Sequence, residues 1–176
     1  FDILTKENIE IRQKKRQEII LEEINTIALE NKFENILDKD LIDELANMVE
    51  YPYLYLGTFP EKYLELPDEV LKYVIQDTQK YCLVYKDGKI INYFIGVSNV
   101  KINNNIIIGN QRVINPRLDD ASFFISKDLA SDIFSKKEFL KRLIFHKKLG
   151  SVFDKVERIK KLSSHINKKS YSDNHL

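Results

Sequence analysis

Residues 109–124 bring together side chains whose chemistry an ordinary hydrophobic core does not require. Two arginines, Arg112 and Arg117, are followed closely by two carboxylates, Asp119 and Asp120. A guanidinium group presents a planar fork of N–H donors that suits bidentate contact with phosphate. A pair of carboxylates can serve acid–base catalysis, although adjacent acids more often cap helices or face solvent. The run alone therefore identifies no reaction, and it marks the two arginines as candidate phosphate ligands.

The same residues allow a purely structural interpretation. Proline inside a helix removes a hydrogen bond and crowds the preceding turn, so Pro116 is expected to break or kink a helix there. Ion pairs between arginines and aspartates would then fix the break, and two phenylalanines would fill the core. The residues of this interpretation are Arg112, Arg117, Asp119, Asp120, Asp128, Phe123 and Phe124. For the arginines, the sequence leaves both interpretations open.

Charge is divided unevenly along the chain. The whole sequence has a net charge of +1, but residues 136–176 contain twelve Lys or Arg and four Asp or Glu. This segment therefore carries +8, and residues 1–135 carry −7. A basic segment such as this one, which contains Lys147 and Lys148, is expected beside an acidic body where a polyanion or an acidic partner contacts one end of a protein. The alternative is that these lysines are the solvated faces of ordinary helices.

The sequence lacks signals of catalysis, metal binding and membrane insertion. It has no Gly-rich phosphate loop, no Gly-x-Ser-x-Gly elbow and no His-Glu-x-x-His helix. Its three histidines are not spaced as metal ligands, and its single cysteine, Cys82, is expected to be a small buried hydrophobe in a strand. No apolar stretch reaches the roughly 20 residues of a membrane helix. We therefore expect a soluble, cytoplasmic protein without a catalytic residue or metal site in this chain.

Hydrophobic periodicity predicts helices in the first part of the chain. Thr5 is expected to cap a helix that runs to about Asn31 and has an apolar stripe along one face. Asp40 is expected to cap a second helix, which Pro52 stops. Pro67 is expected to begin a third helix, because proline suits the first helical position.

The middle of the chain predicts strands. Residues 51–59 are aromatic and aliphatic and indicate a buried strand. Residues 81–85 and 90–97 indicate two further strands, joined by a turn with Asp87-Gly88 at its tip, which tight hairpins favour.

Helices are expected again in the last part of the chain. The pattern predicts a helix over residues 105–127 that is broken or kinked near Pro116, and a helical segment over residues 139–144. Ser151 is expected to cap a final amphipathic helix. This order of elements predicts an α+β fold with one main domain, since domains commonly have roughly 100 to 150 residues.

An ordered series of motifs resembles the β subunit of the bacterial heterotetrameric glycyl-tRNA synthetase. The series begins with Leu-Ile-Asp-Glu-Leu at 41–45 and includes the whole run at 109–124. Its other members lie at 49–52, 57–59, 65–71, 79–81, 94–99, 149–151, 154–155 and 158–159. One departure is that the family usually has His-Gln-Lys-Tyr-Phe where this chain has Thr-Gln-Lys-Tyr-Cys at 78–82. A role that depends on that histidine or phenylalanine does not carry over.

The resemblance implies an enzyme of two α and two β subunits that joins glycine to its tRNA through an ATP-dependent adenylate. The adenylate site would belong to the α subunit, so this chain would hold no cofactor and would not be catalytic alone. We expect an N-terminal helix in residues 1–35 and a module like the B3/4 domain of phenylalanyl-tRNA synthetase in residues 36–135. Residues 136–176 would begin a truncated helical domain of HD type, and a chain that starts with Phe1 is expected to be part of a longer polypeptide.

The resemblance also implies partners, namely tRNA-Gly and the synthetase α subunit. Two roles stay open, which are binding of the tRNA acceptor arm and a scaffold that docks the α subunit. An editing hydrolase is disfavoured, because a pocket for glycine excludes larger amino acids sterically. The candidate tRNA-binding residues are Arg112, Arg117, Lys147, Lys148, Lys155 and Arg158.

Overall fold

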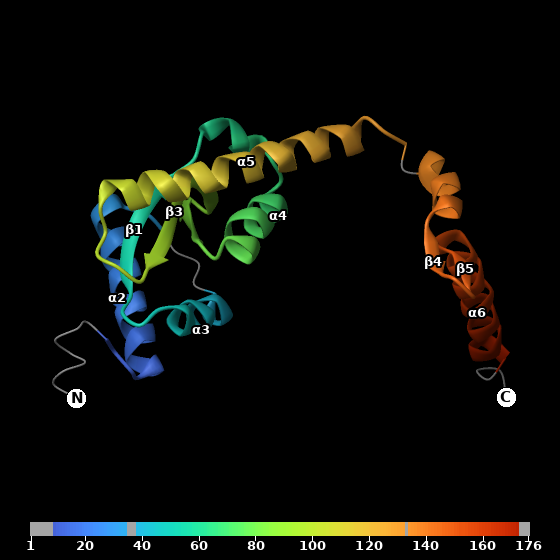
Figure 1. Cartoon of the computed structure of the whole chain (residues 1–176), viewed down its shortest axis with the longest axis horizontal. Helices are drawn as coiled ribbons and strands as arrows, with labels where there is room; N and C mark the ends of the chain where they lie inside the picture. Colours follow the sequence, from blue (N-terminus) through green and yellow to red (C-terminus); the bar gives the residue numbers. More distant parts are fainter. Residues whose placement is uncertain (1–8, 35–37, 133, 173–176) are drawn as a thin grey trace. The chain divides into compact units, whose positions relative to one another are not determined.

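The part of the chain that the structure describes consists of helices and two small antiparallel sheets (Figure 1). The computed structural model describes residues 9–34, 38–132 and 134–172. The chain forms two compact units, residues 1–124 with a three-stranded sheet and residues 125–176 with a two-stranded sheet. The mixed helical and strand character expected from the sequence is confirmed. No helix in the described ranges is long and apolar enough to cross a membrane.

The three-stranded sheet is built from β1 (Tyr53–Thr58), β2 (Cys82–Lys86) and β3 (Lys89–Ser98), in the order β1-β3-β2. Both strand pairs are antiparallel, so β3 is the central strand. Asp87 and Gly88 have φ angles of 51° and 73°, the left-handed conformation that a two-residue hairpin turn requires. The predicted strands and the Asp-Gly hairpin are confirmed.

One face of the sheet packs against α2 (Gln13–Asn31) and α3 (Lys39–Met48). The apolar stripe predicted for the first helix is confirmed, because its isoleucines enter a shared core with α3 and the sheet. The buried members of this core are Ile20, Ile24, Leu41, Ile42, Leu45, Ala46, Cys82, Val84 and Ile95.

The starts of both helices differ from the prediction. α2 begins at Gln13, although a helix from Thr5 was expected, and Thr5 itself lies outside the described residues. Residues 9–12 instead supply backbone acceptors to the Arg16 guanidinium, which also donates to the Ala46 carbonyl oxygen at 2.6 Å. α3 is capped by Asp38 and not by Asp40, because the Asp38 carboxylate accepts two of the unpaired N–H groups of the first turn.

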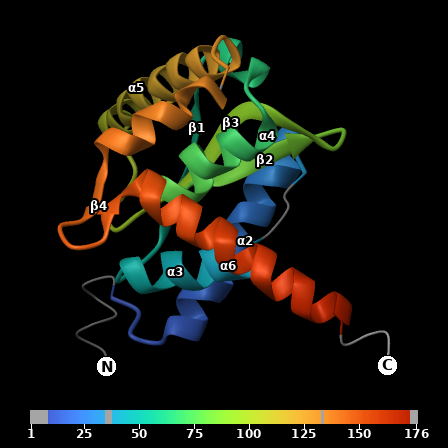
Figure 2. The same ribbon diagram turned by 90° about the vertical axis from the view of Figure 1, so that its right-hand side faces the viewer.

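The opposite face of the sheet carries aromatic residues beside glycines. Phe94 is fully buried, and a Cβ at Gly57 would collide with its ring. A Cβ at Gly96 would likewise collide with the ring of Tyr55. The rings therefore lie flat over the glycines, and α5 covers this face (Figure 2).

Three short helical segments connect β1 to β2. They are η1 (Glu61–Glu65, a 3-10 helix), α4 (Asp68–Leu71) and η2 (Lys72–Thr78), in which the backbone continues α4 as a π-helix. The helix predicted after Pro67 is thus confirmed, with a wider turn in its second half. The wider turn carries Gln76 into the interior, where its Nε2 donates to Asp38 Oδ2 at 3.0 Å.

A single long helix, α5 (Asn104–Leu129), contains the run at 109–124. A break at Pro116, one of the two outcomes predicted, is wrong, because the helix continues through this residue. Ile114 and Leu118, on either side of the proline, are fully buried, and this packing holds the helix together across the missing hydrogen bond. The prediction that Phe123 and Phe124 fill the core is also wrong, since their exposed fractions are 57% and 62%.

The second unit consists of η3 (Phe134–Arg142, a 3-10 helix), β4 (Ile144–His146), β5 (Gly150–Ser151) and α6 (Val152–Ser172). The helix expected over residues 139–144 is replaced by the end of η3 and the start of β4. The final helix and its cap at Ser151 are confirmed. None of the residues of this unit whose burial the structure describes is buried.

Candidate functional site

The polar residues of the 109–124 run divide into two groups with different surroundings. Asn110 and Gln111 hold α5 onto the sheet, because Asn110 Oδ1 accepts from the Tyr81 hydroxyl at 2.7 Å and Gln111 Nε2 donates to Thr58 Oγ1 at 2.9 Å. Both bonds join residues more than 25 positions apart in the sequence. These two side chains therefore position the helix.

Asp119 belongs to the same positioning group. Its Oδ1 accepts from the buried Tyr63 hydroxyl at 2.6 Å and from Lys62 Nζ at 3.1 Å. The hydrogen bond from Tyr63, followed by that from Lys62, lowers the pKa of Asp119 below its ordinary value. Asp119 thus ties η1 to α5 and remains ionised, a structural task that leaves no general acid or base at this position.

Arg112 and Arg117 form the second group. Both side chains are exposed, and within the described residues neither makes an ion pair or a hydrogen bond to a side chain. The ion pairs with neighbouring aspartates that the structural interpretation required do not form. At 100° per residue, five positions separate the two side chains by about 140° around the helix. The two arginines are therefore available to a partner, on different sides of α5.

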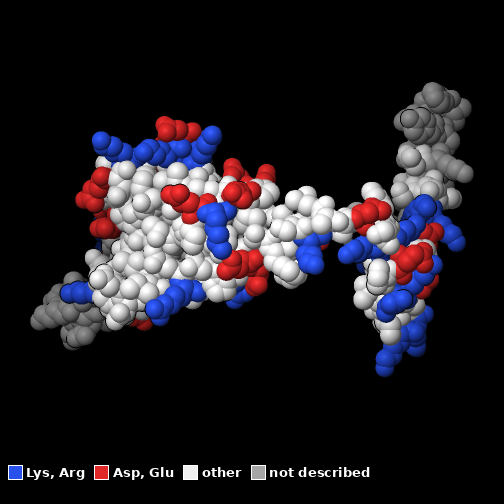
Figure 3. Space-filling model, turned by 90° about the horizontal axis from the view of Figure 1, so that it is seen from above, with Lys and Arg blue, Asp and Glu red and all other residues white. Residues whose placement is uncertain are grey.

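The second unit places its basic residues around a small hairpin. Ile144 pairs with Ser151 and His146 with Gly150, so Lys147, Lys148 and Leu149 form the turn between β4 and β5. Figure 3 shows a cluster of Lys and Arg side chains on the visible face of this unit. The turn is closed by a backbone bond of 3.0 Å from the Leu149 N–H to the His146 carbonyl.

The start of α6 is fixed by a reciprocal cap. Asp154 Oδ2 accepts from the backbone N–H and from the hydroxyl of Ser151, each at 2.7 Å, while Ser151 Oγ accepts from the Asp154 N–H. The bond from the Ser151 backbone is the main reason that the pKa of Asp154 lies below its ordinary value. Arg158 Nη1 donates to the Leu149 carbonyl at 2.9 Å, so this candidate RNA ligand also holds the hairpin to α6.

Cations lie over aromatic rings throughout the second unit. Lys155 Nζ is 4.4 Å from the centre of the Phe145 ring, and Lys141 Nζ is 5.0 Å from that of Phe153. Arg142 lies 5.3 Å from the ring of Phe139. No cation-binding role was predicted for these phenylalanines, although their alternation with lysines in the sequence was a signal that could have indicated it.

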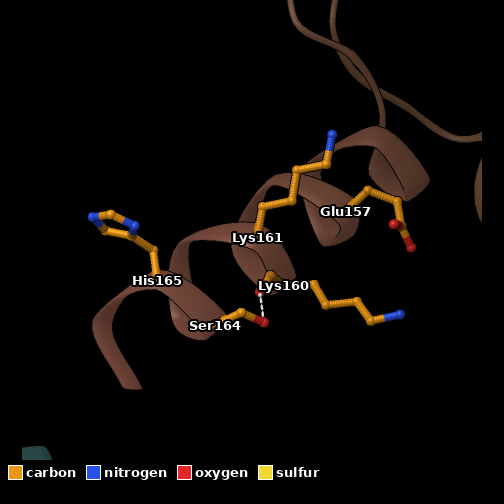
Figure 4. Close-up of a pocket in the computed structure, with 5 residues that line it drawn as sticks. All are labelled: Glu157, Lys160, Lys161, Ser164 and His165. Atoms are coloured by element: carbon orange, nitrogen blue, oxygen red, sulfur yellow. Dashed lines mark hydrogen bonds between the residues drawn. The ribbon is translucent and has the colours of Figure 1, made fainter. Parts of the chain in front are cut away.

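The hollows on the surface of the second unit include two that basic side chains line. The first, of about 620 Å³, lies between the hairpin, the end of η3 and the start of α6, and we call it the hairpin hollow. It is lined by Lys141, Ile144, His146, Lys147, Gly150, Ser151, Phe153 and Asp154. The second, of about 410 Å³, runs along α6 from Glu157 to His165 (Figure 4). It is formed by one helix alone, whereas three elements converge on the hairpin hollow.

The described residues include no cluster of metal ligands and no reactive cysteine thiolate. No group of His, Cys, Asp or Glu side chains there could hold a metal ion. Cys82 is buried, and this burial raises the pKa of its thiol to about 12, so it is not a thiolate nucleophile. The prediction that Cys82 is a small buried hydrophobe is confirmed.

The structure therefore brings four of the six candidate residues together. Lys147, Lys148, Lys155 and Arg158 belong to the hairpin and the first two turns of α6. Arg112 and Arg117 lie in the first unit, on α5. The aromatic rings and the hairpin hollow are the features that sequence reasoning missed.

The chain is similar to proteins of a single family. Residues 1–175 match the family described as glycyl-tRNA synthetase beta subunit. The chain is 41% identical over 151 residues to the glycine–tRNA ligase beta subunit of Aquifex aeolicus, covering 86% of this chain and 23% of that protein. It is 43% identical over 152 residues to the corresponding subunit of Acinetobacter baumannii, covering 85% of this chain and 22% of that protein.

A third relative extends the comparison to another bacterial group. The glycine–tRNA ligase beta subunit of Streptococcus agalactiae is 38% identical over 160 residues, covering 89% of this chain and 24% of that protein. The chain thus spans about a quarter of the length of the curated relatives it matches. The family match covers nearly the whole chain, and the chain belongs to the glycyl-tRNA synthetase beta subunit family.

Proposed function

We propose that this chain is part of a glycine–tRNA ligase and that its second unit binds tRNA through charge. The observation that carries the proposal is the charge of this unit, whose described residues contain thirteen Lys or Arg and five Asp or Glu. Phosphate contacts supply most of the sequence-independent affinity of such surfaces, and they suit a structured RNA that hides its base edges. The unit would hold the acceptor arm without reading its sequence.

The complete enzyme would contain α subunits that form the glycyl adenylate from ATP. This assignment leaves no catalytic task for the described residues, in agreement with the structural role of Asp119 and the inert thiol of Cys82. The partners would be the α subunit and tRNA-Gly, and the site of action the cytoplasm, where tRNA is charged.

We assign the domains in the same way. Residues 36–135 would form a B3/4-like module, with residues 1–35 as its N-terminal helix and residues 136–176 as the first part of an HD-type helical domain. What supports the last assignment is that the second unit buries none of its described residues, although apolar side chains such as Ile159, Leu162 and Ile166 line one side of α6. Such a face is stable when further helices cover it.

Titration of the full heterotetramer with labelled tRNA-Gly tests the RNA role. The double change Lys147→Gln, Lys148→Gln removes two charges from the β4–β5 turn and is expected to weaken binding. If each lysine contacts one phosphate, the slope of log K against log salt falls by about 1.4 to 1.8. Fluorescence anisotropy between about 50 and 200 mM salt measures this slope.

A matched control is present in the same chain. Lys86 and Lys89 flank the β2–β3 turn, as Lys147 and Lys148 occupy the β4–β5 turn, and both are exposed. The change Lys86→Gln, Lys89→Gln removes the same charge from the acidic unit and is expected to leave the slope unchanged. Equal effects of the two double changes would contradict a binding site in the second unit.

A second candidate function is docking of the α subunit by the first unit. The observation that favours it is an apolar side of α5 on which Val113 and Phe124 are both exposed by more than 40% and, being eleven positions apart, lie within about 20° of each other around the helix. Exposed apolar surface of this kind indicates a protein contact. Co-purification of the α subunit with a Phe124→Ser β subunit tests it, and undiminished co-purification would count against this face.

A further inference from the structure

We propose that the hairpin hollow holds an unpaired nucleotide of the bound RNA, with the base stacked on Phe153 and the phosphate between Lys141 and Lys147. This inference rests on the proposed RNA-binding role and narrows it to a ligand class and a position. The hollow combines an apolar wall of Phe153 and Ile144 with a basic rim, and its volume of about 620 Å³ lies within the roughly 300 to 1,000 Å³ of small-molecule sites.

The ring of Phe153 is suited to stacking. Lys141 Nζ lies 5.0 Å and Lys137 Nζ 5.6 Å from its centre. A base that stacks on this ring takes the place of a lysine over its face, and the displaced ammonium group then lies close to the phosphate of the same nucleotide. At least four cation–ring pairs occur among the described residues of the second unit, whereas such pairs occur roughly once per 70 to 80 residues in proteins.

The polar groups of the rim favour an anion. His146 Nδ1 accepts from the Lys148 N–H at 3.2 Å, so a neutral ring carries its proton on Nε2 and can donate it to a ligand. The acidic group of the lining, Asp154, accepts two hydrogen bonds from Ser151. These two hydrogen bonds partly offset the negative charge of the Asp154 carboxylate. Lys141 and Lys147 give the lining of the hollow a net positive charge.

A paired nucleotide does not satisfy this site. Bases inside a duplex are stacked on both faces, so an aromatic side chain cannot reach them, whereas bases in loops and at ends are open to stacking. A surface that binds RNA through charge alone would need no aromatic ring. A change of Phe153 therefore distinguishes stacking of an unpaired base from purely electrostatic binding.

Competition between two RNA probes in the full heterotetramer tests the proposal. One probe is a labelled single-stranded oligouridylate, and the other is an RNA duplex with the same number of phosphates. Phe153→Leu keeps an apolar side chain and removes the ring, and it is expected to weaken oligouridylate binding about fivefold or more, since stacking contributes about 1 to 3 kcal/mol per base. Duplex binding is expected to change less than twofold.

Two further variants exclude trivial explanations. Phe153→Tyr retains the ring face and is expected to restore binding of the single strand, which a merely unfolded hairpin would not do. Tyr73→Leu removes an exposed aromatic ring from the first unit and is expected to have no effect. Unchanged binding by Phe153→Leu, or equal weakening by Phe153→Leu and Phe153→Tyr, would overturn the proposal.

The lysine and phenylalanine variants together distinguish failure of the nucleotide site in the hairpin hollow from failure of the proposed RNA-binding function on which it rests. If the double change of Lys147 and Lys148 weakens tRNA binding while Phe153→Leu leaves oligouridylate binding intact, the hollow is not a nucleotide site and the electrostatic role stands. If neither change affects binding of any RNA, both proposals fail.

Discussion

Gly109 and Gly57 are expected to respond in opposite directions to the same substitution by alanine. Gly109 is exposed in the interior of α5, and a Cβ there would meet no atom within 4 Å. Glycine inside a helix is less favourable than alanine by roughly 0.5 to 1 kcal/mol, because it loses more backbone entropy on folding. Gly109→Ala is therefore expected to stabilise α5 by about this amount.

Gly57 has no such space. A Cβ at this position would lie 2.7 Å from both Cε atoms of Phe94, which is fully buried in the central strand. The ring cannot withdraw without disturbing the face that α5 covers. Overpacking of this kind costs typically about 1 to 3 kcal/mol, so Gly57→Ala is expected to destabilise the sheet.

Native-state hydrogen exchange of the β subunit, read by mass spectrometry, measures both effects locally. With RT near 0.59 kcal/mol, Gly109→Ala is expected to slow exchange of α5 amides about two- to fivefold. Gly57→Ala is expected to accelerate exchange in β1 and β3 about 5- to 150-fold. Faster exchange of α5 in Gly109→Ala would refute the open surroundings of Gly109, and unchanged exchange in Gly57→Ala would refute the close packing of Phe94.

The Gly109→Ala variant also tests whether a partner contacts this part of α5. Nothing in the described chain requires glycine at 109, and Arg112 lies one turn further along α5. If Gly109→Ala stabilises the helix and also weakens binding of tRNA or of the α subunit, the partner approaches the helix backbone at this point. If binding is unchanged, the partner contacts of α5 lie elsewhere.

Three further predictions concern single groups. At pH 8 a thiol reagent should label Cys82 far more slowly in the native than in the urea-unfolded protein, because burial raises its pKa to about 12; equal rates would contradict this. The pKa of Asp154 in the folded protein is lowered from 3.8, chiefly by the hydrogen bond from the Ser151 N–H. The cap therefore stabilises α6 fully above pH 3.8, and this stabilisation is lost as the pH falls through the lower pKa of the folded state. Protection at the start of α6 should therefore fall on acidification in the wild type but not in Asp154→Asn. Finally, Tyr81→Phe leaves Asn110 Oδ1 without its donor, and should lower the opening free energy of α5 by about 0.5 to 1.5 kcal/mol; unchanged protection would show that this bond does not hold the helix.

Elements specified by nearby residues were predictable from the sequence. The turn at Asp87-Gly88 needs two residues with positive φ, and this sequence signal is local. The cap at Ser151 is also local, because the bonds join residues three positions apart. Strand β1 followed from aromatic and aliphatic residues between a proline and a glycine.

Errors arose where distant contacts override a local preference. Pro116 was expected to break or kink the helix, but the helix is unbroken, because burial of Ile114 and Leu118 outweighs the lost hydrogen bond. Asp119 was expected to pair with an arginine on its own helix, yet Tyr63 and Lys62, more than 50 positions away in sequence, hold its carboxylate. Such partners have no signature in the local sequence.

The sequence by itself determined the family, the basic character of residues 136–176 and the absence of a conventional catalytic motif, because composition and ordered motifs are properties of the chain alone. Only the tertiary structure decided which polar residues of the 109–124 run are structural and which face outward. It also placed Lys141 over the ring of Phe153 and formed the hairpin hollow. The physical reason is that charge adds along a sequence, whereas hydrogen bonds, stacking and cavities depend on which segments meet in space.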